Sequence, residues 1–149
     1  TETGEVVKAF DVRDGTGIKY WLRVGKRAAL ISGRTSRTIE HRARELGIEH
    51  VFQGAKDKAP VVARLIRDLK MRPEQVAYVG DDLTDLVVMR GVGFPVAVAD
   101  AVEEVRSVAK FVTRARGGEG AVREVIELVL KFQGLWDEVM SRYRPVGPP

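Results

Sequence analysis

Short apolar runs alternate with amphipathic segments along nearly the whole chain, and this alternation limits the folds that it can adopt. The short runs have the length and composition of buried strands, whereas the longer segments repeat their apolar residues at helical spacing. Strands that alternate with helices are typical of a mostly parallel sheet covered by helices. The sequence therefore predicts an α/β fold. The expected strands are residues 6–12, 28–31, 51–52, 76–79, 94–98 and 111–113.

The amphipathic segments also carry helix start and stop signals. Thr35 or Ser36 can cap one helix, and Gly47 follows its last apolar residue. Gly25 ends the apolar spacing of the helix before it in the same way. The expected helices lie around residues 18–24, 36–46, 60–69, 82–89, 102–108 and 120–132, with a possible continuation from 134 to about 143.

Composition excludes some classes of protein. The 149 residues suit one domain, and the absence of cysteine excludes disulfides and thiolate metal sites. The net charge is +4, but basic residues are interspersed with acidic ones, which disfavours a nucleic-acid partner. No apolar run approaches the roughly 20 residues of a membrane span, and no signal peptide opens the chain. We expect no membrane partner and a cytoplasmic location.

The loops that follow the predicted strands are the candidate ligand sites, because open α/β sheets bind ligands beyond the carboxyl ends of their strands. One of them, GDDLTD, places Asp81, Asp82 and Asp85 within five residues. Carboxylates this dense repel one another unless a cation or a helix N-terminus offsets their charge. Oxygen ligands at a strand end suit Mg²⁺. The alternative interpretation is a helix cap with solvated neighbours.

Three other loops carry groups that can bind anions. Ser32, Gly33 and Arg34 offer a hydroxyl, a backbone amide and a guanidinium after the second predicted strand. Lys58, near the start of its helix, can neutralise a phosphate oxygen, although a lone lysine is usually a surface residue. The segment RARGGEG is glycine-rich and can form an anion-binding turn at a helix start, or a simple loop.

The segment DVRDGTG, residues 11–17, resembles the Asp-x-Asp-Gly-Thr loop of aspartate nucleophiles but has one residue too many. Two side chains share a face of a strand at i and i+2, not at i and i+3. Asp11 and Asp14 are therefore poorly spaced for one metal and one phosphate. No Asp-x-Asp pair occurs anywhere in the chain.

Four segments taken in order resemble one family: ISGR, QGAKDK, YVGDDLTDLVVM and AKFVTRARGGEGAVRE. They are similar to the haloacid dehalogenase superfamily and, within it, to the 3-deoxy-D-manno-octulosonate 8-phosphate phosphatases. The resemblance covers nearly all of residues 5–127. It implies one Rossmann-like three-layer domain over 1–149, without a cap domain, with a small N-terminal hairpin and a helix end and tail over about 135–149. It also implies a homotetramer.

The resemblance further implies a Mg²⁺-dependent phosphatase acting on a phosphorylated sugar acid. Ser32 and Lys58 would contact the phosphoryl group. Asp81 would bind the metal directly, with Asp82 and Asp85 as a second ligand or as groups that hold Lys58 and the waters of the metal. Candidates for the sugar acid are Arg13, Gly33, Arg34, Arg114, Gly117 and Gly118.

In this family the nucleophile lies in an Asp-x-Asp loop after the first strand of the sheet, upstream of the segment similar to DVRDGTG. We therefore expect the first strand and nucleophile loop to be absent from residues 1–149, as in a shortened version of a longer polypeptide, and this stretch alone to be inactive. Two alternatives remain open. One is a phosphatase for a nonulosonate 9-phosphate, and the other is a non-catalytic binding or assembly module.

Overall fold

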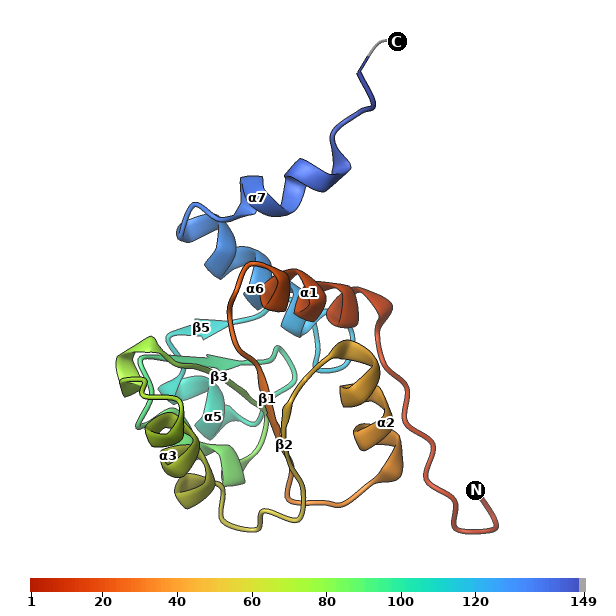
Figure 1. The fold of residues 1–149 in the computed structure, drawn as a ribbon. Helices are drawn as coiled ribbons and strands as arrows, with labels where there is room; N and C mark the ends of the chain where they lie inside the picture. The colour runs from red at the N-terminus through yellow and green to blue at the C-terminus, as the bar shows by residue number, and fades with distance from the viewer. Residues whose placement is uncertain (148–149) are drawn as a thin grey trace.

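The computed structural model describes residues 1–147 (Figure 1). Its strands form two parallel sheets, and the strand order in each is set by helical crossovers. β1 (Ala29–Ile31) pairs with β2 (His50–Phe52). β3 (Ala77–Gly80) pairs with β4 (Phe94–Ala97), which also pairs with β5 (Phe111–Val112). The expected α/β fold with parallel strands is confirmed, and the bounds of these five strands differ from the predicted ones by at most one residue at each end.

Most helices begin and end close to the predicted signals, but α1 begins at Val12, six residues before the expected start at residue 18. Ser36 is the N-cap of α2, and Gly47 adopts the left-handed conformation with φ of 80° just after its last residue. Lys58 is the first residue of α3, two residues before the expected start at Pro60. The helices are α1 (Val12–Arg23), α2 (Arg37–Leu46), α3 (Lys58–Asp68), α4 (Leu86–Met89), α5 (Glu103–Val108), α6 (Ala121–Phe132) and α7 (Trp136–Met140). Three short 3₁₀ turns are η1 (Pro73–Gln75), η2 (Leu83–Asp85) and η3 (Ser141–Tyr143).

Two groups of helices flank the strands. α1 packs along α6, with α2 and α7 beside this pair, whereas α4 and α5 pack against β3 and β4, and α3 packs on α4 (Figure 1). β4 lies at the centre of the core, and its residues Val96 and Ala97 are fully buried. Leu130 on α6 is also fully buried, which stabilises the fold by about 2 kcal/mol. The layered arrangement agrees with the predicted Rossmann-like sandwich.

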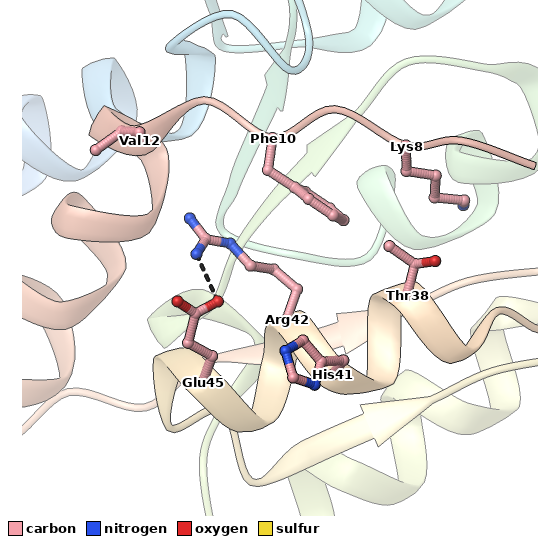
Figure 2. Close-up of a pocket in the computed structure, with 7 residues that line it drawn as sticks. All are labelled: Lys8, Phe10, Val12, Thr38, His41, Arg42 and Glu45. Carbon is pink, nitrogen blue, oxygen red and sulfur yellow. Dashed lines mark hydrogen bonds and ion pairs between the residues drawn. The ribbon is translucent and has the colours of Figure 1, made fainter.

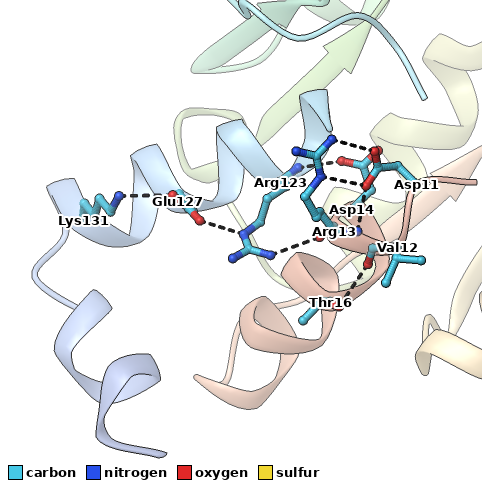
Figure 3. Close-up of polar contacts among 8 residues, drawn as sticks. All are labelled: Asp11, Val12, Arg13, Asp14, Thr16, Arg123, Glu127 and Lys131. Carbon is cyan, nitrogen blue, oxygen red and sulfur yellow. Dashed lines mark hydrogen bonds and ion pairs between the residues drawn. The ribbon is translucent and has the colours of Figure 1, made fainter. Parts of the chain in front are cut away.

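The DVRDGTG segment forms the start of α1 and docks it on α6 (Figure 3). Asp11 is the N-cap and accepts a hydrogen bond from the amide of Arg13 at 2.7 Å. Asp14 accepts hydrogen bonds from the amides of Gly120 and Arg123, 3.2 and 2.9 Å away. A Cβ atom on Gly17 would lie only 2.9 Å from Cδ of Arg123. The two aspartates thus cap helices, in agreement with the expectation that this segment is not the nucleophile loop.

The predicted strand at residues 6–12 and the N-terminal hairpin are wrong. Residues 5–10 have no regular structure, and Val12 already belongs to α1 because Asp11 caps the helix there. Val6 and Val7 are 74% and 82% exposed, so no partner strand covers them. An extended segment without a hydrogen-bonding neighbour is not a stable strand.

The predicted helix beyond Gly134 is confirmed as α7 and η3, after a break at Gly134, where φ is 71°. The predicted tail follows η3 without regular structure up to residue 147, and residues 148–149 lie outside the described part of the chain. Within residues 1–147, none of the helices combines the length and apolar composition that crossing a membrane requires.

Candidate active site

A cavity of about 240 Å³ opens at the carboxyl ends of the strands. It is bounded by the last residues of β1 and β3 and by the loops that follow β4 and β5. The polar side chains on its wall are Lys58, Tyr78, Asp81 and Asp85, and Gly117 closes the side formed by the loop after β5. The cavity therefore lies where the sheet topology predicts a ligand, and it brings four of the predicted site residues together, namely Lys58, Asp81, Asp85 and Gly117.

Asp85 is the best-connected carboxylate of this cavity. Its Oδ1 atom accepts hydrogen bonds from Nζ of Lys58 at 2.6 Å and from the Tyr78 hydroxyl at 2.7 Å. Its Oδ2 atom accepts from the amides of Asp81 and Asp82, at 2.9 and 3.1 Å. Burial alone would raise the pKa of Asp85, but Lys58 and the other three donors outweigh it and lower the pKa to about 2. Asp85 therefore stays ionised and holds the Lys58 ammonium in place.

Gly80 allows this turn to fold back on β3. A Cβ atom at this position would lie 2.7 Å from Cβ of Asp85 and 2.8 Å from Sδ of Met89. Any larger residue at the end of the strand would displace Asp85 from the Lys58 ammonium. A glycine is therefore required at Gly80 of the VGDD sequence, because a side chain there would collide with a residue of the site.

Asp81 and Asp82 differ in how their carboxylates are used. Asp82 Oδ1 accepts a hydrogen bond from the amide of Leu83 at 2.7 Å and caps η2, as the alternative interpretation of this loop proposed. Among residues 1–147, no donor of the protein hydrogen-bonds to the Asp81 carboxylate. Burial and the nearby Asp85 carboxylate raise the pKa of Asp81. A cation beside Asp81 would relieve this repulsion, so the oxygen ligands present fit Mg²⁺.

The set of three carboxylate ligands is not assembled in the structure. No group of three acidic or histidine side chains in the described residues surrounds a common metal position. Asp85 already accepts four hydrogen bonds, so direct ligation by its carboxylate would compete with these contacts. Asp82 uses one carboxylate oxygen to cap its own turn and does not line the cavity. The geometry favours Asp81 as the direct ligand and Asp85 as the group that holds Lys58.

Ser32 directly follows Ile31, which lines the cavity. The backbone of Ser32 is fixed from both sides, because its amide donates to Phe52 O at 2.8 Å and its carbonyl accepts from Ala55 N at 2.9 Å. Its hydroxyl oxygen accepts a hydrogen bond from the amide of Arg34 at 3.1 Å. The hydroxyl hydrogen can still donate to an anion. Gly33 and Arg34 lie exposed in the same loop.

The glycine loop, defined as residues 114–120, differs from the predicted anion-binding turn in how its backbone amides are bonded. The amide of Gly117 donates to Oδ1 of Asp100 at 2.8 Å and is not free for a ligand. Gly118 is exposed and has φ of 75°. The side chain of Arg114 is exposed at the start of the loop. Arg13 forms a salt bridge of 3.0 Å with Asp11, and its guanidinium lies beside Gly120.

Sequence reasoning missed four residues around the site. Tyr78 points to the same side of β3 as Gly80, and period-two alternation before the GDD turn could have indicated it. Burial and the Asp85 carboxylate raise the pKa of Tyr78, which therefore remains a hydrogen-bond donor. Asp14, Asp100 and Glu124 hold the glycine loop, and no local pattern identifies these long-range contacts.

A second hollow lies away from the strand ends, between the N-terminal segment and α2 (Figure 2). It has a volume of about 330 Å³ and is open to solvent. Arg42 lies over the ring of Phe10, 5.7 Å from its centroid, and forms a salt bridge of 2.8 Å with Glu45. None of the predicted site residues lines this hollow, so the cavity around Lys58 is the candidate active site.

Comparison with known proteins places this site in a family. A model of haloacid dehalogenase-like hydrolases matches residues 47–126, which include Lys58 and the Asp81–Asp85 turn. The chain is 49% identical over 130 residues to the 3-deoxy-D-manno-octulosonate 8-phosphate phosphatase of Yersinia pestis, covering 87% of this chain and 70% of the relative. The chain belongs to the 3-deoxy-D-manno-octulosonate 8-phosphate phosphatase family of the haloacid dehalogenase superfamily. The family resemblance predicted from sequence is confirmed.

Solved structures of the family agree with the fold. A probable phosphatase from Pseudomonas syringae pv. phaseolica superposes with a TM-score of 0.95 at 48% identity, covering 99% of this chain and 84% of that one. The phosphatase from Moraxella catarrhalis superposes with a TM-score of 0.93 at 40% identity, covering 97% and 83%. The Moraxella structure is a complex with a magnesium ion, a phosphate ion and a KDO molecule.

Proposed function

We propose that the protein is a Mg²⁺-dependent phosphatase that hydrolyses 3-deoxy-D-manno-octulosonate 8-phosphate to the free sugar acid and phosphate. The observation that carries the proposal is the buried Lys58–Asp85 pair beside Asp81, at the strand-end cavity of a chain that is 49% identical to such phosphatases. The ligands named for the Moraxella structure are the metal and both products of this reaction.

Each residue of the cavity has a role in this proposal that follows from its contacts. The Lys58 ammonium, held by Asp85, offers positive charge to the oxygens of the phosphoryl group. The Ser32 hydroxyl donates a hydrogen bond to the same group. Asp81 would hold Mg²⁺, which supplies positive charge that offsets the charge of the phosphate ester. Because the side chains of Lys58 and Asp85 are only 12% and 3% exposed, water screens their charges less than it would on an open surface.

The sugar acid carries a carboxylate as well as a phosphate, and arginine binds both well. Of the predicted arginines, Arg13 is already bonded to Asp11. Arg34 and Arg114 form no salt bridge with any of the residues described. We therefore assign Arg34 and Arg114 to the carboxylate end of the substrate.

Hydrolysis of matched substrates tests the proposal. The protein as its gene encodes it is assayed with 3-deoxy-D-manno-octulosonate 8-phosphate, a nonulosonate 9-phosphate and p-nitrophenyl phosphate, with Mg²⁺ or with EDTA. We expect Mg²⁺-dependent turnover with the highest kcat/KM for the octulosonate ester. A preference for the nonulosonate ester would assign the alternative substrate, and equal rates for all three would reject both.

The carboxylate nucleophile implied by the resemblance is to be sought in the coding sequence before Thr1, because residues 1–149 contain no Asp-x-Asp pair. An Asp-x-Asp loop there supports the enzyme, and a start codon at this position favours the non-catalytic module. The homotetramer and the cytoplasmic location remain predictions. Light scattering at micromolar concentration measures the assembly, and cell fractionation measures the location.

A further inference from the structure

Three carboxylates from three different elements hold the backbone of the glycine loop. Glu124 of α6 accepts from the amides of Arg114 and Ala115, at 2.9 and 3.1 Å. Asp100, after β4, accepts from Gly117 at 2.8 Å, and Asp14 of α1 accepts from Gly120 at 3.2 Å. The loop is therefore anchored at its beginning, its middle and its end.

Asp14 supplies the cap that α6 cannot supply itself. The N-cap of α6 is Gly120, which has no side chain and adopts φ of 102°. Asp14, distant in the sequence, accepts a hydrogen bond from Gly120 N at one carboxylate oxygen. Its other oxygen accepts from Arg123 N (Figure 3). A carboxylate at this position satisfies free amides and interacts favourably with the helix dipole. Gly17, one turn later in α1, allows the two helices to approach closely enough for this contact.

The anchored loop reaches the active site. Gly117 lines the cavity that holds Lys58 and Asp85. Gly118 and Gly120 have positive φ, and a Cβ atom on Gly118 would meet nothing within 4 Å. Such a loop would sample many conformations without its anchors, because glycine has the largest backbone freedom. Glu124 holds the amides of Arg114 and Ala115, so the anchor at the start of the loop also sets where the Arg114 side chain begins.

We propose that Asp14 is a positioning residue for substrate recognition, which fixes the glycine loop at the cavity rim so that Arg114 meets the carboxylate of the sugar acid. This inference rests on the proposed function. Asp14 touches neither the cavity nor the reacting group, and it acts through Gly120 and the first turn of α6. The position of the glycine loop thus depends on a residue of α1 that is distant from it in the sequence.

Kinetics on two substrates separates this role from a merely structural one. In Asp14→Asn the amide can accept at only one atom, so one of the two bonds is lost. We expect KM for 3-deoxy-D-manno-octulosonate 8-phosphate to rise about tenfold, the effect of losing one charged hydrogen bond, with kcat within about twofold of the wild type. Turnover of p-nitrophenyl phosphate, which lacks the carboxylate, should not change. Glu124→Gln, which loosens the beginning of the same loop, should give the same pattern.

Glu127→Gln is the matched control. Glu127 belongs to the same polar network and binds the side chains of Arg123 and Lys131, at 2.7 and 3.1 Å, but no amide of the loop (Figure 3). The KM values of Glu127→Gln for both substrates should equal those of the wild type. Amide hydrogen exchange gives a readout without turnover: Asp14→Asn should accelerate exchange at Gly120 and Arg123, and Glu127→Gln should not.

The outcomes distinguish this inference from the proposed function. Equal loss for both substrates in Asp14→Asn and Glu124→Gln, or faster exchange without a change in KM, would overturn the positioning role. If the wild type already shows no preference for the octulosonate ester, the proposed function fails instead, and the exchange data then report only how the loop is held.

Discussion

Nζ of Lys58 lies 2.6 Å from Oδ1 of Asp85, and the two side chains are only 12% and 3% exposed. This buried pair joins the first turn of α3 to the turn after β3. A buried charge without its partner is costly, so each side chain holds the other in place. The pair therefore links the stability of the fold to the charge that the site presents to a phosphate.

Asp85→Asn should lower the free energy of unfolding by about 3 kcal/mol, because the buried Lys58 ammonium would lose its carboxylate partner and one of the two oxygens that accept the four hydrogen bonds would be replaced. Urea unfolding measures the change. The control is Asp82→Asn, which should cost under about 1 kcal/mol, because asparagine caps a turn as well as aspartate does. Equal losses in the two variants would show that the buried pair does not contribute to stability.

Acid should weaken the metal-free protein through the same carboxylate. The pKa of Asp85 is about 2 in the folded state against 3.8 when unperturbed, so its stabilising contribution is present above 3.8 and is lost as the pH falls toward 2. The contribution amounts to about 2 kcal/mol. Urea unfolding in EDTA over this pH range should show a steeper loss of stability in the wild type than in Asp85→Asn. Parallel curves would contradict the assignment.

Asp81→Asn should weaken Mg²⁺ binding at least about tenfold, as expected for the loss of a charged ligand, whereas Asp82→Asn should change it far less. The reason is that the Asp82 carboxylate caps the Leu83 amide, while Asp81 lines the cavity. Isothermal titration of both variants with Mg²⁺ measures the difference. Equal losses would mean that Asp82 leaves its cap to bind the metal.

Arg114→Gln should raise KM for the octulosonate ester by about tenfold, because it removes a charge that has no carboxylate partner in the described structure. Arg116→Gln is the matched comparison two residues later. The guanidinium of Arg116 lies 3.7 Å from Asp100, so it is partly neutralised within its own loop, and the variant should change KM less. Steady-state kinetics decides, and a larger effect at Arg116 would reverse the assignment.

Gly17→Ala should destabilise the fold by about 1–2 kcal/mol, because the new methyl group would press on the Arg123 backbone and separate α1 from α6. Gly15→Ala should cost less, because two of the three nearest atoms in its way belong to the far end of the long Arg42 side chain, which can change rotamer. Both changes favour the helix locally, so the difference between them reports packing. Thermal unfolding of the pair measures it, and equal melting temperatures would show that close α1–α6 contact is not required.

The local sequence predicted the helices and the core strands well, because apolar spacing and glycine stops are properties of neighbouring residues. Gly47 ends α2 and Lys58 lies at the start of α3, as expected. It also placed Lys58, Asp81 and Asp85 around one cavity, since parallel strands bring their carboxyl ends to the same edge. The N-terminal strand was predicted wrongly, because an apolar segment forms a strand only where another strand can pair with it, and Val6 and Val7 are exposed.

Periodicity and short motifs were enough to predict the parallel α/β arrangement, the strand-end position of the site and the family, because these depend mostly on residues that are close in the chain. The role of each carboxylate depends on the folded arrangement instead. Asp85 binds Lys58 instead of lying free, Asp82 caps its own turn, and Asp14 caps a helix 106 residues away. A carboxylate has the same chemistry in each case, and its role follows from the donors that folding brings within hydrogen-bond distance.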